Sequence, residues 1–572
     1  MRRTLLAVLV ATSPTVVSAQ ATPAAERQSL PRDIRREVVT RWNSPGATAL
    51  RSSERLAIDE GHEVRGDVLV RRGPLTIGGH VRGNVLAVNA DVFLRPTARI
   101  DGDILVVGGA LNGRSTARVD GATRIYHQGF PYREDGDRIL DTEDENNADD
   151  NWWRRIERRR EGNWSEALRI VQAGAYNRVE GLPIELGPVI HRRTPWGSVH
   201  LAGAAVIRTA SSFDSDRADV GHTLRTEVRV GQTRAVGVGA RVFSIVDPVQ
   251  QGQLSDLEAA LASFGWRRDY RDHFQRHGAN GYVTLYGARD LSITGSFGQE
   301  RWSSREQHNP ITILDGSKPW RPNPKMDEGL FRVASVAMSF DTRTDPDAPW
   351  SGWLLNADIE HGNGTVTQVA QTSIPRLVFA GDDVAYTRGF FDFRRYNRLG
   401  PTAQLNMRVI LGGRLGGDPL PLERRLSVEG PGELPGFDFR SLRAQPNVGT
   451  CNGAVSAPGR PAECERIALA QVEYRGDLRL DLLSNWDYWP RHYRSAHGDA
   501  VWVLFADAGR GWKVGQPDGS MTYSSTDFPS FSTFRTDMGV GIDVGGIGLY
   551  AAKSLSSPSE SLNFFLRLRH RF

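Results

Sequence analysis

Histidine, serine and cysteine are the side chains from which this sequence could build a catalytic centre, and their spacing does not predict one. Most of the 13 histidines stand singly, as do His191, His200, His222 and His492. We find no Gly-x-Ser-x-Gly elbow in a strand-turn-helix setting and no spacing typical of zinc ligands. We therefore expect no enzyme activity, no cofactor and no metal site.

The two cysteines, Cys451 and Cys464, lie close together in a stretch rich in glycine, proline and alanine. In an exported protein we expect them to form a disulfide that staples a loop. Two unpaired loop thiols are the alternative.

The net charge argues against one class of partner. A formal charge of +4 over 572 residues is too small to indicate nucleic-acid binding.

The N-terminus predicts export. Arg2 and Arg3 precede the short apolar run from Thr4 to Ala11, and Val17-Ser18-Ala19 offers small residues at a cleavage site. We interpret residues 1–20 as a signal peptide. A buried N-terminal helix is the alternative.

No later segment is long and apolar enough for a transmembrane helix. The hydrophobic fraction of 39% and the mean hydropathy of −0.41 fit a soluble protein. They fit a membrane β-barrel equally well, because only one face of each barrel strand meets lipid.

A repeat follows over residues 36–129. Its copies begin Val64-Arg65-Gly66-Asp67, Val81-Arg82-Gly83-Asn84, Ile100-Asp101-Gly102-Asp103 and Val119-Asp120-Gly121-Ala122. Stacked coils of short strands would bury a column of apolar residues that no single coil could bury. Residues 60–128 resemble the bactofilin-like, polymer-forming β-solenoids, which implies end-to-end association. A capped spacer or plug is the alternative.

Residues 130–173 differ in composition from both of their neighbours. Two acidic runs, 134–137 and 141–145, precede the basic run 154–160. Opposed charge blocks with few apolar residues predict a solvated linker. The acidic runs lack the spaced ligands and central glycine of a calcium loop.

Residues 174–572 predict a transmembrane β-barrel. In the segment 534–543, Met538, Val540 and Ile542 fall on one face, whereas Asp537 and Asp543 fall on the other. This alternation over about ten residues matches a membrane-spanning strand. The segments 224–230 and 468–475 repeat it.

The last segment ends the chain on an amphipathic strand. Leu562, Phe564 and Leu566 share one face with the terminal Phe572, and Arg567 and Arg571 lie on the other face, which would line the lumen. An ending of this kind resembles outer-membrane proteins generally, in which the terminal Phe is part of the signal for barrel assembly.

Four motifs together resemble the barrel of the bacterial surface-antigen, or outer-membrane assembly-factor, superfamily. They are Tyr176–Leu182 at the expected start of the barrel, Asp341–Pro346 as a periplasmic turn, Glu433–Phe437 as the tip of an inward loop, and Phe505–Trp512 on a late strand. The resemblance implies an all-β fold with about 16 strands. We place five strands after the inward loop, near 466–478, 499–511, 534–543, 545–554 and 561–572. About ten precede it, so we expect a missed strand between 250 and 325.

The loop tip departs from the family pattern. The tip residues are Leu434, Pro435, Gly436 and Phe437, and Pro435 stands where the family carries an arginine that enters the lumen. The resemblance places two acids opposite the loop, Glu473 and Asp507. Because buried carboxylates require a cation, we expect Arg440 to substitute. Solvation in the lumen, or pairing with lumen arginines on other strands, is the alternative.

The resemblance implies assembly of outer-membrane proteins or translocation of polypeptides. Its expected partners are outer-membrane lipid, the machinery that inserts the barrel, and unfolded client proteins or envelope partners, with the N-terminal domain in the periplasm. A solenoid stands where family members carry polypeptide-binding modules, which weakens this expectation. The replacement of the loop arginine by Pro435 favours a second hypothesis, a structural envelope anchor. A third is a plugged pore, whose lumen arginines would favour anions.

Overall fold

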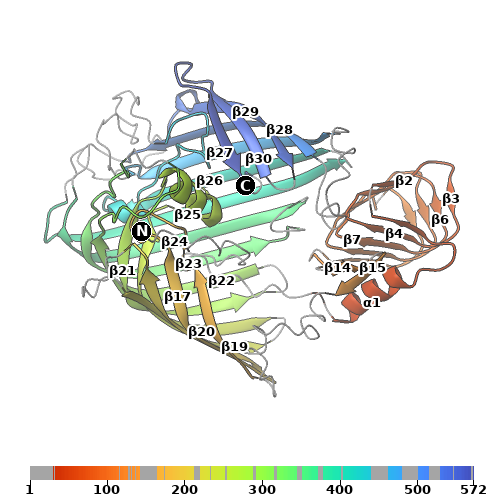
Figure 1. The fold of residues 1–572 in the computed structure, drawn as a ribbon, viewed down its shortest axis with the longest axis horizontal. Helices are drawn as coiled ribbons and strands as arrows, with labels where there is room; N and C mark the ends of the chain where they lie inside the picture. The colour runs from red at the N-terminus through yellow and green to blue at the C-terminus, as the bar shows by residue number, and fades with distance from the viewer. Residues whose placement is uncertain are drawn as a thin grey trace, which may run out of the picture.

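The computed structural model describes residues 30–141 and 164–572. Within these ranges the longer undescribed segments are 211–219, 371–377, 440–461, 479–499 and 515–527, and the others are one to five residues long. The predicted signal peptide, residues 1–20, lies outside the described residues. Figure 1 shows two parts, a small β-domain and a large curved sheet.

The small domain is the β-solenoid that the repeat predicts. Its coils form three parallel sheets. The first sheet contains β1 (Leu50–Ser52), β4 (Val68–Arg71), β7 (Val85–Val88), β10 (Ile104–Val107) and β13 (Thr123–Tyr126). The second contains β2 (Leu56–Ile58), β5 (Leu75–Ile77), β8 (Val92–Leu94) and β11 (Leu111–Asn112). The third contains β3 (Glu63–Val64), β6 (His80–Val81), β9 (Arg99–Ile100) and β12 (Arg118–Val119). Apolar side chains from all three sheets form one buried core.

The repeated glycines are explained by close stacking of the coils. A Cβ atom on Gly83 would lie 2.4 Å from the carbonyl carbon of Gly66, and one on Gly102 would lie 2.5 Å from the Gly83 oxygen. Backbone this close excludes any side chain. The residue after each glycine binds the next coil, because Asp67 Oδ1 accepts a hydrogen bond from Asn84 N at 2.7 Å.

A helix and a hairpin cover the outer side of the first sheet. Helix α1 (Arg32–Asn43) buries Ile34, Val38 and Trp42 against that sheet. The hairpin of β14 (Tyr132–Asp135) and β15 (Arg138–Asp141) lies beside α1, with Trp42 Nε1 donating to Asp137 O at 3.0 Å. This hairpin falls within the predicted linker, 130–173. Its acidic sequence had suggested solvation, but Ile139 is fully buried.

The large sheet has 16 antiparallel strands, each paired with its neighbours in sequence. The strands before the long loop are β16 (Trp164–Gln172), β17 (Pro183–Thr194), β18 (Gly197–Arg208), β19 (Val220–Gly231), β20 (Ala235–Pro248), β21 (His273–Tyr286), β22 (Leu291–Ser304), β23 (Glu328–Asp341), β24 (Gly352–Gln368), β25 (Asp383–Gly400) and β26 (Ala403–Gly417). Those after it are β27 (Arg466–Leu478), β28 (Ala500–Trp512), β29 (Arg535–Val544), β30 (Ile547–Ser554) and β31 (Asn563–Arg567).

The all-β class, the 16 strands and the five strands after the loop are as expected. The missed strand is accounted for, since β21 and β22 lie between residues 250 and 325. Two expectations are wrong. The sheet begins at Trp164 rather than 174, so Tyr176–Leu182 lies between the first two strands and not before the first. The last strand ends at Arg567 and does not reach Phe572.

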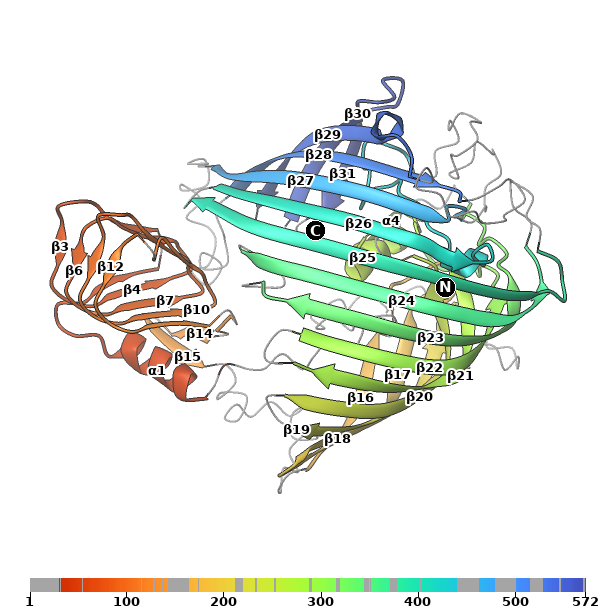
Figure 2. The ribbon, with the colours of Figure 1, turned by 180° about the vertical axis from the view of Figure 1, so that it is seen from behind.

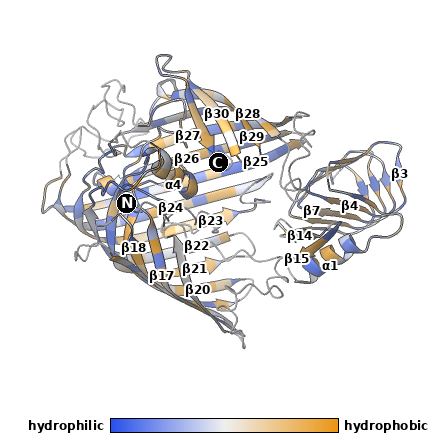
Figure 3. Ribbon diagram, in the orientation of Figure 1, coloured by the Kyte–Doolittle hydropathy of each residue, from blue (hydrophilic) through white to orange (hydrophobic). Residues whose placement is uncertain are grey.

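Burial separates the two faces of the sheet as the alternation predicts. On β29, Met538, Val540 and Ile542 are about half exposed, whereas Asp537 and Asp543 are buried. Large apolar side chains are exposed on the outer face of most strands. So extensive an apolar surface is untenable in water and is typical of a sheet that meets lipid. Figure 2 shows the strands curving around the opposite face, and Figure 3 shows the mixed polarity along them.

The connections divide the sheet into a turn end and a loop end. Most connections at the turn end are short, as at 195–196, 287–290, 401–402 and 545–546. The loop end carries long connections, among them 249–272, 305–327, 418–465 and 513–534. The solenoid lies at the turn end, where Arg398 Nε of β25 is 3.9 Å from Asp91 Oδ2. Among the described residues, no helix is both long and apolar enough to cross a bilayer.

Candidate functional site

The inner face of the sheet is lined with buried ion pairs. Glu360 on β24 receives hydrogen bonds from Arg388 on β25 at 3.2 Å and from Arg424 at 2.6 Å. Arg424 belongs to the long loop between β26 and β27, and it also stacks over Trp302 at 4.2 Å. The loop therefore enters the space that the sheet encloses, as expected for an inward loop, and ion pairs bind it to the wall.

The tip of this loop contacts the last strands of the sheet. Gly436 N donates to Asp537 Oδ2 on β29 at 2.6 Å, and Asn563 Nδ2 on β31 donates to Pro435 O at 3.1 Å. A Cβ atom on Gly436 would lie 2.5 Å from Cβ of Asp537, so only glycine allows this approach. Leu434 and Phe437 are buried in an apolar cluster beside the tip.

The two predicted lumen acids are buried on neighbouring strands and face different cations. Glu473 on β27 accepts from Arg475 Nη1 at 3.0 Å and from Asn406 Nδ2 at 3.3 Å. Asp507 on β28 is bound by Arg571 Nη2, near the C-terminus. Arg440, the cation that we expected here, lies outside the described residues. Among the described residues, the cations that bind Glu473 and Asp507 are therefore the lumen arginines Arg475 and Arg571.

The end of the chain folds back inside the sheet. The Arg571 guanidinium lies 3.6 Å from the centroid of the Phe505 ring, and Phe572 is 7% exposed. Asp507 lies in register with Asp537 on β29, which lies in register with Ser554 at the end of β30. Because Arg571 binds Asp507, its side chain lies beside the beginning of β31 and not beyond the end of that strand. The predicted terminal signal residue, Phe572, is therefore buried and not part of a strand facing lipid. The ion pair with Asp507 accounts for the reversal.

A helix contacts the end of the last strand. Helix α4 (Asp256–Trp266) lies in the connection between β20 and β21. Its Glu258 accepts from Arg567 Nε at 2.7 Å and from the backbone N of Leu568 at 2.9 Å. Both charged side chains are at most 7% exposed. Because Glu258 takes the amide of Leu568, that amide is not available to a neighbouring strand.

A seam separates the first and last strands. In the described part of the chain, β16 pairs only with β17, and β31 pairs only with β30. The strands shorten toward this seam, from 13 residues in β28 to 10, 8 and 5 in β29, β30 and β31. The loop tip, α4 and the folded-back terminus all contact the last strands from inside.

A cap of loops closes over the first strands at the loop end. Arg178, which is fully buried, lies 2.9 Å from Asp269 and 3.1 Å from Asp272. Burial alone would raise the pKa of the Asp269 carboxyl, but the charges of Arg178 and His273 outweigh it and hold that pKa below its usual range. Arg178 belongs to the motif 176–182, so the motif anchors loops instead of starting the barrel.

Sequence reasoning missed Arg571, Glu258 and Asp537 as members of this site. Alternation assigned Arg571 and Asp537 only to the inner face of their strands. No sequence feature near Arg571 indicates that the end of the chain turns back. Cys464 is disulfide-bonded, and the only other cysteine of the sequence, Cys451, lies outside the described residues. Among the described residues, no group of three His, Cys, Asp or Glu side chains could hold a metal ion.

The comparisons with known proteins find structural similarities alone. No protein-family model matches the chain, and no curated protein matches its sequence. BamA from Haemophilus ducreyi, solved without POTRA domains 1–3, aligns at 13% identity and a TM-score of 0.40 over 76% of this chain and 79% of that chain. CdiB from Acinetobacter baumannii aligns at 10% identity and 0.29 over 76% and 68%. CdiB from Escherichia coli aligns at 12% identity and 0.29 over 71% and 62%. The assignment of the fold rests on the strand pairing and burial described above.

Proposed function

We propose that the chain is an outer-membrane β-barrel that assembles other barrels or passes polypeptides at the seam between β16 and β31. The observation that carries the proposal is this seam, because β16 and β31 each have one edge that pairs with no other strand among the described residues. An unpaired strand edge offers hydrogen-bond donors and acceptors to an incoming strand, which is the chemistry of β-augmentation.

The contacts on the inner face suggest how such a seam is kept available. Glu258 binds Arg567 and the amide of Leu568, so the last strand stops short. Arg571 then holds the chain end at Asp507, away from the edge. An unfolded client with an amphipathic strand would pair with the free edge while its apolar face meets lipid.

The arrangement of the two ends supports the orientation. Barrels of this class have short turns on the periplasmic side and longer loops outside. The solenoid lies at the turn end, near Arg398, and so belongs in the periplasm in this proposal. An exported chain with such a domain would reach the membrane as unfolded protein and need the insertion machinery as a partner.

A disulfide across the seam tests the proposal. Single cysteines along 164–172 would be combined with Phe564→Cys on β31, in a background where Cys451 and Cys464 are alanine. Phe564 is exposed on the outer face, so its replacement leaves the inner contacts intact. If the seam acts in assembly, the oxidised form should lose the ability to support folding of other barrels, and reduction should restore it. Equal activity in both forms would contradict the proposal.

A structural anchor is the second candidate, and one observation favours it. Asp91 of the solenoid is 1% exposed, and its Oδ2 faces Arg398 of β25. A contact between the solenoid and the barrel suits a protein that holds a periplasmic domain at a fixed place on the membrane. The same disulfide separates the candidates, because an anchor works with a closed seam.

A further inference from the structure

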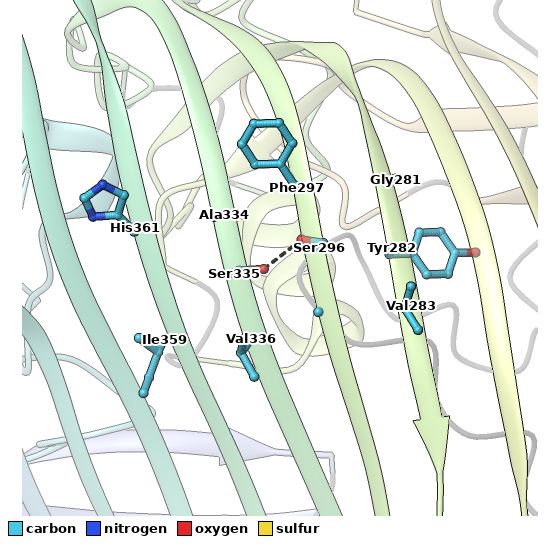
Figure 4. Close-up of a pocket in the computed structure, with 11 residues that line it drawn as sticks. Gly281, Tyr282, Val283, Ser296, Phe297, Ala334, Ser335, Val336, Ile359 and His361 are labelled. Carbon is cyan, nitrogen blue, oxygen red and sulfur yellow. Dashed lines mark hydrogen bonds between the residues drawn. The ribbon is translucent and has the colours of Figure 1, made fainter.

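The outer face of β21–β24 carries a groove just where the apolar surface ends. Figure 4 shows the groove, which has a volume of about 580 Å³. Gly281, Gly295 and Ala334 form its floor, and the exposed Phe297 and Val336 rise beside it. A Cβ atom on Gly295 would meet nothing within 4 Å, so the glycine leaves a real space on the surface.

Two arginines stand above this groove, toward the loop end. Arg301 on β22 pairs in register with Leu330, and Arg332 on β23 pairs with Gln299. The two arginines are therefore diagonal neighbours on one face, roughly 7 to 8 Å apart at their backbones and within reach of a common ligand. Both are exposed, and no ion-pair partner is found for either among the described residues.

Neither arginine has an acid as its register partner, since Arg301 lies between His277 and Leu330, and Arg332 lies between Gln299 and Asn363. His277 pairs in register with Arg301, and His361 lies opposite Ala334 at the rim of the groove. Glu328 and Asp383 carry the nearest outward carboxylates, and each is held by a neutral donor, Ser304 N at 3.1 Å and Thr365 Oγ1 at 2.6 Å. A cationic patch of this kind would attract an anion.

The position along the strand identifies the anion as part of a lipid. Below Arg332, the outward positions of β23 down to Phe340 hold Ala334, Val336 and Met338. From Ala334 to Phe340 they span about 20 Å along the strand, which a strand tilt of about 40° reduces to about 15 Å along the membrane normal, within the apolar band of about 25 Å in membrane barrels. Arg301 and Arg332 are the first charged side chains above these positions on the outer face of β22 and β23. Arginine binds phosphate through two parallel hydrogen bonds.

We propose that this face binds a lipid whose phosphate groups give it a net negative charge, with a phosphate between Arg301 and Arg332 and one acyl chain in the groove over Gly295. The inference rests on the membrane location in the proposed function but not on the seam. Charge and groove lie on the same four strands and would hold the two ends of one lipid molecule.

Native mass spectrometry of the purified full chain in detergent tests the proposal, with diphosphoryl lipid A and phosphatidylcholine as probes. Wild-type protein should retain lipid A and should not retain phosphatidylcholine comparably. The double variant Arg301→Gln/Arg332→Gln should bind lipid A about tenfold more weakly or worse, because at least one charge-assisted hydrogen bond is lost. The control Arg192→Gln/Arg395→Gln removes outward arginines at the turn end and should bind normally.

A second variant tests the groove separately. Gly295→Leu places an apolar side chain in the groove, where its Cβ has no atom within 4 Å, and should weaken lipid A binding, whereas Ala357→Leu, outside the groove on β24, should not. Unchanged lipid A binding in the double arginine variant would overturn the proposal, as would full displacement of lipid A by inorganic phosphate. None of these variants touches the seam, so client folding in the same proteins reports independently on the proposed function.

Discussion

Replacing Arg571 with methionine should release the end of the chain from the lumen. The substitution keeps an unbranched apolar stem and removes the charge and the hydrogen-bond donors. Asp507 would then lose its cation while remaining beside Asp537, its register partner on β29. The Arg571 and Asp507 side chains are 2% and 0% exposed, so solvent does not screen their interaction.

The expected cost follows from the burial of this pair. Removing one partner of a buried ion pair costs about 3 to 5 kcal/mol, because the other charge is left uncompensated. Asp507 and Asp537 can share a proton after the change, so we expect a value near the lower end, about 3 kcal/mol. Adding Asp507→Asn removes the orphaned charge and should recover about 2 kcal/mol of that loss.

Urea unfolding of the full chain in detergent micelles measures the free energy, and carboxypeptidase digestion measures access to the C-terminus. Arg225→Met is a matched control, because Arg225 pairs with Glu227 on the inner face but is 32% exposed. It should cost about 1 kcal/mol or less and leave the terminus protected. If Arg571→Met unfolds like the wild type and its terminus stays protected, the ion pair does not hold the chain end.

Three further outcomes are expected. Burial raises the pKa of the Asp91 carboxyl above its ordinary value, so Asp91 favours folding below the unfolded pKa of about 3.9 and loses that contribution as the pH rises through the folded pKa. Asp91→Asn should therefore raise the melting temperature of the solenoid at neutral pH and much less in acid, and an equal shift at both pH values would contradict this. Gly83→Ala should destabilise the solenoid by about 1 to 3 kcal/mol, since its Cβ would collide with Gly66. The control Gly129→Ala should not, because the atom nearest to its Cβ would be 3.7 Å away. Equal melting temperatures of the two variants would count against close stacking of the coils. Arg178→Met should expose the loop cap to proteolysis without changing strand content by circular dichroism, and intact protease resistance would show that the cap does not depend on it.

The repetitive parts of this fold could be predicted from the sequence because their physics is local. Alternation along β29 separates Val540 from Asp537, and one face of the strand must meet lipid while the other does not. The repeated Gly66 and Gly83 mark the close stacking of coils. Alternation with a period of two residues, or a repeat as long as one coil, can be seen in the sequence without knowing which distant residues are in contact.

The non-local parts could not be predicted. The pairing of Arg571 with Asp507 joins residues on the last segment and on β28, and alternation assigned Arg571 only to the inner face. The end of β31 at Arg567 depends on Glu258, which comes from a helix about 300 residues earlier in the chain. The first strand at Trp164 was missed because a charged run precedes it.

Depletion of this protein in its native host, followed by quantifying folded, heat-modifiable outer-membrane proteins, tests the central claim most directly. If the seam serves assembly, several other barrels should fall while their transcripts stay constant. An unchanged set of folded barrels, accompanied by a failure of cell shape or envelope attachment, would contradict the claim and favour the anchor.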